Sequence, residues 1–362
     1  MNYVGLQLAG SVPWLRLKNF AASAAVVALS CAVFRFAPYN KRLFDALYGS
    51  PAFSFSGAEF LFSAAVGYLA LLGWYYLLER DPATSKSLRF FRVIGSFVRS
   101  PKESLRQRLG IEDRVALLAT LLKAFFGPMM TMSMMIFSMR AWANGSAIVA
   151  SGAFGAGLLP LFDAHGFWFL MQLILFVDVF VFAVGYLVEM PRLGNQIRSV
   201  DPTLLGWGAA LLCYPPFNQL SGAILGSSLT DFPRFEDPMT HVILNALLLA
   251  LMAIYTSASV ALGFKASNLT HRGIVARGPY ALIRHPAYVC KNMAWWIGSL
   301  PLVGVAFAQS WLDGVLAVAS VTGWTLLYVL RALTEEDHLR SVDGAYAAYA
   351  AKVRYRFIPG LV

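Results

Sequence analysis

The sequence predicts an all-α polytopic transmembrane helical bundle of about eight spans, and three observations favour this fold class. Hydrophobic residues make up 58% of the 362 residues and charged residues only 13%. This composition is more apolar and less charged than that of soluble globular domains. The apolar residues gather in runs of about 20, the length that an α-helix needs to cross a bilayer. The basic residues lie mainly between these runs. We therefore expect an integral, multi-pass membrane protein.

Eight apolar runs are expected to form the spans. In chain order they are Phe20–Ala37, Phe53–Leu78, Val115–Met139, Gly166–Val188, Leu204–Gly226, His241–Phe264, Tyr288–Ser310 and Trp311–Leu333. The fifth is the weakest, because Pro215, Pro216 and Asn218 interrupt it. An acidic loop follows this fifth run. We therefore expect an N-terminal region of about five spans at residues 1–239 and a separate C-terminal region at 240–362.

The distribution of charge predicts the orientation. Segment 79–114 carries nine lysines and arginines, whereas segment 227–239 holds three acidic residues and one arginine. Because basic loops stay in the cytoplasm, the first segment is expected to be cytoplasmic. Counting spans from there places residues 265–285 and the tail after Thr334 on the same side. Within the basic segment, Leu88–Arg99 is typical either of a helix lying in the membrane interface or of an ordinary loop.

The formal net charge of +10 does not predict a nucleic-acid partner. The basic residues are scattered over short loops, where they suit anionic membrane lipids. The three cysteines, Cys31, Cys213 and Cys290, lie in apolar runs without the spacing of metal ligands. We therefore expect membrane lipids as partners, and neither nucleic acid nor metal.

A first polar motif, Gly278-Pro-Tyr-Ala-Leu-Ile-Arg-His-Pro-Ala-Tyr288, stands directly before an apolar run. Its opening Gly-Pro pair signals a turn, and Pro286 suits the first position of the helix that follows. Arg284 and His285 therefore stand beside a helix N-terminus, whose free N–H groups and dipole attract anions. The motif predicts an anion-binding helix start.

A second polar motif, Arg331-Ala-Leu-Thr-Glu-Glu336, ends the last apolar run. Arg331 and Glu335 are four residues apart, so on a helix they share a face. Placing an arginine at the membrane margin costs free energy when it is alone and much less when a carboxylate lies beside it. Because an ordinary helix end can also contain such a pair, this motif by itself does not indicate a binding site. A second Arg-containing motif on the same predicted membrane face favours a shared site.

Together the motifs resemble a known family. Gly278-Pro-Tyr, Arg284-His-Pro-x-Tyr288, Arg331-x2-Thr-Glu-Glu336 and the closing Phe357-Ile-Pro359 are similar to the C-terminal region of isoprenylcysteine carboxyl methyltransferases and related phospholipid methyltransferases. The resemblance covers about a quarter of the chain, residues 268–359. It implies a membrane bundle with a cofactor pocket at the cytosolic face, where a methyl group passes from S-adenosyl-L-methionine to a lipid or lipidated acceptor entering from the bilayer.

The resemblance also implies roles for individual residues. Cofactor-binding roles fall to Tyr280, His285, Pro286, Tyr288, Glu335 and Glu336, with one of the two glutamates holding the ribose hydroxyls. Catalytic roles fall to Arg284, Arg331 and Glu336, with the two arginines nearer the acceptor. One departure concerns the acceptor, because Cys290-Lys291-Asn292 stands where the family often has a small residue. The long N-terminal region is a second departure.

The chemistry of methyl transfer agrees with these residue types. Displacement at a sulfonium requires two partners held in line and water kept out. A carboxylate or phosphate acceptor needs only cations to orient it, and two arginines suit an oxyanion. An amine acceptor must lose a proton, with His285 or His338 as candidate base. The abundance of arginine favours an oxyanion, and a phospholipid amine N-methyltransferase is the alternative.

Two further classes fit parts of the sequence. Membrane sterol reductases that use NADPH belong to the same broad superfamily, but the tail at residues 335–344 lacks their Cys-x2-Lys-Tyr-Gly signature. A transport or non-catalytic lipid-binding bundle would account for Asp178 within an apolar run and for the interruption at Pro215 and Pro216. No internal repeat supports transport.

Overall fold

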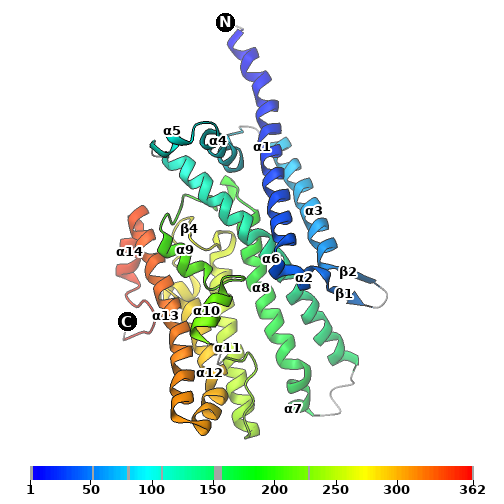
Figure 1. Ribbon diagram of the computed structural model, residues 1–362, viewed down its shortest axis with the longest axis vertical. Coiled ribbons are helices and arrows are strands. Elements are labelled where there is room, and N and C mark those ends of the chain that lie inside the picture. Colours follow the sequence, from blue (N-terminus) through cyan, green and yellow to red (C-terminus); the bar gives the residue numbers. More distant parts are fainter. Residues whose placement is uncertain are drawn as a thin grey trace. The chain divides into compact units, whose positions relative to one another are not determined.

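The computed structural model describes residues 3–50, 53–79, 82–106, 109–150, 157–226 and 229–360. These residues are helical almost throughout, and they include two short two-stranded sheets (Figure 1). Six of the described helices are long and apolar enough to cross a membrane, which confirms the predicted polytopic helical bundle. The chain divides into two compact units, Met1–Ser133 and Met134–Val362. The predicted functional division at residue 239 stays a prediction.

The first unit is built on two long helices, α1 and α3, that pack against each other. Its elements are α1 (Tyr3–Phe36), α2 (Lys41–Asp45), β1 (Leu47–Ser50), β2 (Phe53–Ser56), α3 (Gly57–Leu78), α4 (Lys86–Arg99), α5 (Pro101–Arg106) and the first part of α6 (Ile111–Ala150). The Ser56 hydroxyl accepts a hydrogen bond from the Glu59 amide at 3.2 Å, which caps α3. The second predicted span therefore becomes helical only at Gly57.

Helix α4 covers the segment for which the sequence allows an interfacial helix or a loop. The Ser85 hydroxyl caps it by accepting a hydrogen bond from the Leu88 amide at 3.2 Å. Arg89 Nη2 lies 2.6 Å from Glu112 Oε2 in the first turn of α6. The segment is thus a helix, and its contact with a membrane interface stays a prediction.

The second unit holds both polar motifs. Its elements are the rest of α6, α7 (Leu158–Leu161), a π turn (Phe162–Gly166), α8 (Phe167–Leu187), β3 (Ser199–Val200), α9 (Leu204–Leu211), α10 (Asn218–Leu225), α11 (Pro238–Leu262), β4 (Thr270–His271), α12 (Pro286–Gln309), α13 (Trp311–Val342) and α14 (Ala345–Lys352). Helix α12 packs between α11 and α13, and α8 packs against α11 (Figure 1). The seventh and eighth predicted spans form a hairpin that turns at Ser310, whose hydroxyl caps α13 by accepting a hydrogen bond from the Asp313 amide at 3.0 Å.

The fifth predicted span is wrong. Residues 204–226 form two helices of 8 residues each, α9 and α10, with Pro215 and Pro216 in the turn between them. Eight residues rise only about 12 Å, less than half of the hydrocarbon core. Proline lacks the amide donor and its ring blocks the preceding turn, so two prolines in succession end a helix. The seventh predicted span forms α12, an unbroken helix of 24 residues. It is not one of the six helices that are both long enough and apolar enough to cross a membrane.

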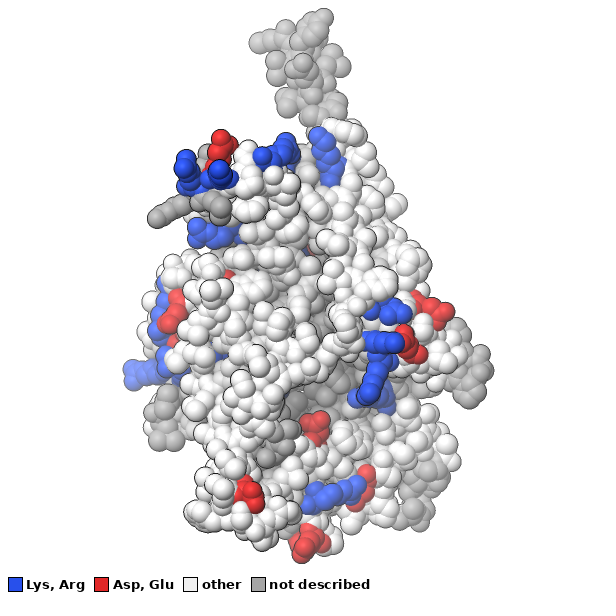
Figure 2. Space-filling view, viewed as in Figure 1, with Lys and Arg blue, Asp and Glu red and all other residues white. Residues whose placement is uncertain are grey.

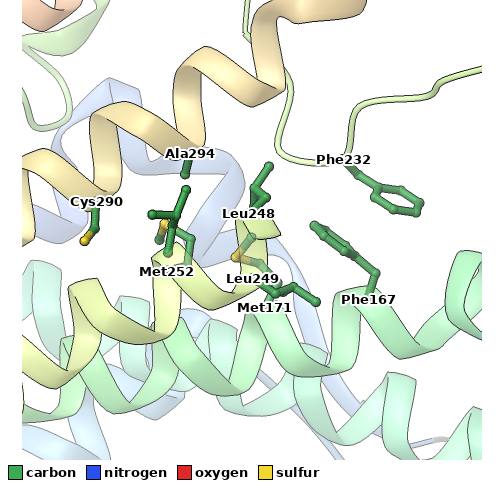
Figure 3. Close-up of a cluster of buried hydrophobic side chains, with 9 residues drawn as sticks. Phe167, Met171, Phe232, Leu248, Leu249, Met252, Cys290 and Ala294 are labelled. Atoms are coloured by element: carbon green, nitrogen blue, oxygen red, sulfur yellow. The ribbon is translucent and has the colours of Figure 1, made fainter. Parts of the chain in front are cut away.

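A buried apolar cluster fixes α8, α11 and α12 against one another (Figure 3). The Phe167 ring, at the start of α8, stacks on Phe232 with centroids 4.2 Å apart. Farther along, Met252 of α11 lies with Cys290 and Ala294 of α12. Because Cys290 and Ala294 are one turn apart and both face this core, they set the rotation of α12 about its axis.

Polar segments from distant parts of the chain meet at one end of this bundle. Strand β3 pairs with β4 in antiparallel register, with Ser199 opposite His271. A Cβ on Gly185 of α8 would lie 1.9 Å from the Ala266 carbonyl oxygen, so glycine is what lets the segment after α11 approach α8. The His285 amide donates to the Arg356 carbonyl at 3.1 Å, which ties the C-terminal tail to the start of α12.

The surface agrees with a helical membrane protein. On the face shown in Figure 2, most of the surface is neither acidic nor basic, and the charged side chains form separate groups. Uncharged helical surface of this extent is typical of contact with lipid.

Candidate functional site

One cavity in the second unit is lined by residues of both polar motifs. Its volume is about 1300 Å³ when the space open to solvent is included. Helices α8, α11, α12, α13 and α14 contribute to its wall, together with the segment between α11 and α12. Motifs some fifty residues apart in the chain are therefore brought together, as the sequence predicts.

The spacing of residues on α13 decides which side chains reach the cavity. Tyr328, Arg331, Glu335 and His338 all line it, and they follow one another at intervals of three or four residues. Such intervals place side chains on one face of a helix. Glu336 is rotated by about 100° from Glu335 and faces another direction. It is not among the residues that line the cavity.

Glu336 is instead surrounded by basic side chains. Its Oε1 accepts hydrogen bonds from His285 Nε2 at 3.1 Å and Arg356 Nε at 3.0 Å. Its Oε2 accepts from Arg356 Nη2 at 3.1 Å and Arg340 Nη2 at 2.9 Å. Arg284 Nε also lies 3.1 Å from Oε1, but its N–H does not point at that oxygen, so this contact is an ion pair without a hydrogen bond. Glu336 is 0% exposed.

The network around Glu336 joins the tail to the rest of the site. The two parallel hydrogen bonds from Arg356 to this carboxylate raise the pKa of Arg356. Buried charges are stable only when paired, and here one carboxylate balances several cations. The predicted contact of Glu336 with the cofactor stays a prediction, and its geometry points to holding α12, α13 and the tail together.

Glu335 has a different environment. Its Oε1 accepts a hydrogen bond from the Tyr288 hydroxyl and pairs with Arg331 Nε at 3.4 Å. Within the described residues no hydrogen-bond partner reaches its Oε2. Of the two glutamates, Glu335 is thus the one that lines the cavity and keeps a carboxylate oxygen for a ligand.

Arg331 is buried, with 5% of its surface exposed, and its guanidinium is held among aromatic rings. The Cζ atom lies 5.1 Å from the Tyr288 ring centroid, 5.5 Å from Tyr214 and 5.8 Å from Tyr328. Its Nη2 donates to Asn268 Oδ1. The contact with Glu335 predicted from their spacing is present, and the ring contacts add cation–π attraction.

The remaining residues of the first motif lie around the start of α12. The His285 ring stacks on Tyr288, with centroids 5.5 Å apart and planes 11° apart. Pro286 is the first residue of α12, as its ring geometry favours. Tyr280 lines the cavity, and its carbonyl oxygen accepts a hydrogen bond from the Tyr349 hydroxyl at 2.9 Å. Burial raises the pKa of Tyr280, and it raises the pKa of Tyr349 to about 12.

Histidines of this region are engaged in hydrogen bonds. His338 Nε2 lies 3.1 Å from the Ser199 hydroxyl. His271 Nε2 lies 2.9 Å from Asp343 Oδ2, and the Gly273 amide donates to its Nδ1 at 3.4 Å. Burial lowers the pKa of His271, with Asp343 acting in the opposite direction. The described residues contain no group of three His, Cys, Asp or Glu side chains arranged to hold a metal ion.

Asn268 and Lys291 are among the cavity residues for which no role was predicted from the sequence. Asn268 holds Arg331, yet in the sequence it reads only as part of a glycosylation sequon on the predicted cytoplasmic side. Lys291 also lines the cavity, with its Nζ near three aromatic rings. Its signal in the sequence is a lysine inside an apolar run, three residues after Tyr288 and hence on the same helix face.

Comparison with known protein families matches one segment of the chain. Residues 232–353 match a family described as a protein of unknown function (DUF1295). The match begins in the loop before α11, includes both polar motifs, and covers about a third of the chain. No curated protein and no solved structure matches. The family description names neither a reaction nor a ligand, so the resemblance to isoprenylcysteine carboxyl methyltransferases remains an expectation.

Proposed function

We propose that this protein is an integral membrane methyltransferase. It uses S-adenosyl-L-methionine to methylate a carboxylate or phosphate oxygen of a lipid or lipidated acceptor, with its active site facing the cytoplasm. The observation that carries the proposal is the pair of Arg331 and Glu335 on the wall of one cavity. A buried cation and a carboxylate with one unpaired oxygen lie side by side there, between helices that are otherwise largely apolar.

The residues of the cavity fit the proposed cofactor in three respects. The unpaired Oε2 of Glu335 suits a ribose hydroxyl, which donates to carboxylates. The ring of Tyr280, which lines the cavity, suits a sulfonium, because aromatic rings attract cations. The apolar part of the wall, which includes Ile274 and Leu339, suits an adenine. When bound, S-adenosylmethionine supplies a methyl carbon that leaves its sulfur as the acceptor oxygen bonds to it.

The chain's own task in such a reaction is to orient the acceptor and exclude water. Arg331 is suited to orientation, because Glu335 and Asn268 fix two of its nitrogens and three tyrosine rings hold its plane. A charge held in this way needs no rearrangement when it contacts an oxyanion. An ionised oxyanion has no proton to lose, so the site needs no general base.

The proposal is tested with the full chain purified into lipid nanodiscs. The protein is incubated with methyl-labelled S-adenosylmethionine and a membrane lipid extract, and the lipids are analysed by mass spectrometry. We expect label in an ester of the lipid fraction, and its loss in Glu335→Gln. Absence of label from every lipid class, together with absence of cofactor binding in a calorimetric titration, would overturn the proposal.

A second candidate, a reductase that uses NADPH, is favoured by one specific observation. A Cβ on Gly273 would lie 3.1 Å from Lys265 Nζ and 3.8 Å from Arg198 Cζ, so two cations flank this glycine at the cavity. Neither pairs with a carboxylate in the described part of the chain. Two such cations suit a phosphate, which NADPH carries and S-adenosylmethionine lacks. Tighter binding of NADPH than of S-adenosylmethionine would reverse the order of the two candidates.

A further inference from the structure

Lys291 is placed unusually for a lysine of an apolar helix. It lies on α12, and its Nζ is 5.6 Å from the Tyr255 ring centroid, 5.2 Å from Trp295 and 5.5 Å from Tyr328. These rings come from three helices, α11, α12 and α13. Aromatic faces stabilise an ammonium without neutralising it, so the positive charge stays available to a ligand.

No carboxylate of the described residues forms an ion pair with Lys291. Asp178 acts on it through the electric field, but both oxygens of Asp178 are already engaged. Tyr255 donates to Oδ2 at 2.9 Å and Ser259 donates to Oδ1 at 2.5 Å. A lysine kept within a membrane helix without a direct partner is costly, and such residues commonly mark a ligand path.

Lys291 and Arg331 both lie near one aromatic ring, that of Tyr328. The Tyr328 centroid lies 5.5 Å from Lys291 Nζ and 5.8 Å from Arg331 Cζ, and all three residues line the cavity. Arg331 already has Glu335 and Asn268 as partners. Of these two cations, Lys291 is therefore the less compensated.

The position of Lys291 along the bundle separates it from the glutamate end. Tyr328 precedes Glu335 by seven residues on α13, which corresponds to about 10 Å along the helix axis toward the turn at Ser310. Lys291 shares that level, because its Nζ lies over Tyr328. The cavity thus has Glu335 at one level and Lys291 at another, deeper among the spanning helices.

We propose that Lys291 binds the negatively charged group of the acceptor, a carboxylate or phosphate on an amphiphile with a long apolar chain. Calling this amphiphile the acceptor rests on the proposed function. The binding test itself does not depend on that function. Arg284, predicted to lie nearer the acceptor, also lines the cavity and is paired with Glu336, so its role at the acceptor stays a prediction. Lys291 and Arg331 then form the cationic pair that selects an acid over an amine.

The test measures binding of simple probes to the full chain in phosphatidylcholine nanodiscs. The probes are dodecanoate, dodecyl phosphate and dodecylammonium, which share one chain and differ in the charged group. The variants are Lys291→Met, Lys291→Arg and, as a matched control, Lys352→Met, an exposed lysine of α14. The cofactor is titrated into each protein, and thermal unfolding is followed.

We expect wild type to bind an anionic probe and to bind dodecylammonium at least tenfold more weakly. Lys291→Met should lose about tenfold in affinity for the anion, while Lys291→Arg and Lys352→Met stay within about threefold of wild type. A preference for dodecanoate over dodecyl phosphate identifies a carboxylic acid as the acceptor, and the reverse preference identifies a lipid phosphate.

The outcomes for the cofactor and for the probes are independent. Equal affinity of Lys291→Met and wild type for both anions, or equal affinity of wild type for the amine, would overturn the role of Lys291. Failure of S-adenosylmethionine to bind any of the proteins would instead overturn the proposed function and leave the anion site standing. Unchanged cofactor affinity and unfolding temperature in Lys291→Met show that the lost probe binding is not a folding defect.

Discussion

His285 Nε2 lies 3.1 Å from Glu336 Oε1, although 51 residues separate the two along the chain. His285 directly precedes α12, so the carboxylate stands near a helix N-terminus, where the backbone dipole attracts negative charge. The sequence predicts an anion at this helix start, and the chain supplies one from its own helix α13. The carboxylate available to a ligand is the neighbouring one, Glu335.

Glu336→Gln should destabilise the second unit. The substitution removes the negative charge that balances Arg284 and Arg356, while the half-exposed Arg340 can turn to water. Removing one partner of a buried ion pair typically costs about 3–5 kcal/mol. We expect a lower thermal unfolding midpoint in detergent, with Glu335→Gln as the matched control one residue away. Equal midpoints for Glu336→Gln and wild type would show that the network adds nothing to stability.

Glu335→Gln should weaken cofactor binding, and it should lower stability less than Glu336→Gln does. The reason is that Arg331 keeps Asn268 and three tyrosine rings as partners. The Glu335 carboxylate lines the cavity and has one unpaired oxygen, so the lost charge is felt by a ligand more than by the fold. Loss of a charge-assisted hydrogen bond corresponds to about 1.5–3 kcal/mol, or roughly tenfold to a hundredfold in affinity. Isothermal titration with S-adenosylmethionine measures it. If Glu336→Gln that is still folded loses cofactor and Glu335→Gln does not, the assignment of the two glutamates is reversed.

Local patterns gave the sequence-based predictions that hold. Hydropathy located α8, α11 and α13, because the length of an apolar run is a property of the chain alone. The contact of Arg331 with Glu335 followed from a spacing of four residues. Hydropathy failed at residues 204–226, where the prolines end the helix in a run that is still apolar.

Contacts between distant segments could not be predicted in the same way. Arg356 reaches Glu336 because the tail is hydrogen-bonded to the start of α12. The spacing of these two residues in the sequence does not predict their contact. The environment of Lys291 depends on rings from three helices, so it requires their packing to be known. The sequence shows a lysine within an apolar run, but it does not show which aromatic rings surround that lysine.

Arg331→Lys should lower turnover far more than cofactor affinity. Lysine keeps the charge but loses the planar fork that contacts Glu335 and Asn268. Because the acceptor is already ionised and loses its charge as it bonds to the methyl carbon, Arg331 acts by orienting it, and misplacement of the acceptor by about 1 Å costs roughly 10²-fold in kcat. We expect the dissociation constant for S-adenosylmethionine to change by about threefold or less. Arg354→Ala, at an exposed arginine of the tail, is the control. Wild-type turnover in Arg331→Lys would exclude Arg331 from orienting the acceptor.

His271 should make stability depend on pH. Burial lowers its pKa below the ordinary value of 6.5, so the folded protein holds this histidine neutral at a pH where the unfolded chain binds a proton. Stability from this group is therefore complete above pH 6.5 and is lost as the pH falls from 6.5 toward the lowered value. Arg198 and Lys265 lower the pKa further, and Asp343 opposes them.

The measurement is the thermal unfolding midpoint between pH 5 and pH 8 for wild type and His271→Gln. Glutamine can keep one hydrogen bond to Asp343 but cannot titrate in this range. We expect the midpoint of wild type to fall more steeply below pH 6.5 than that of the variant. A steeper fall in His271→Gln would mean that Asp343 dominates, with the pKa of His271 raised rather than lowered, because stability would then be gained on protonation.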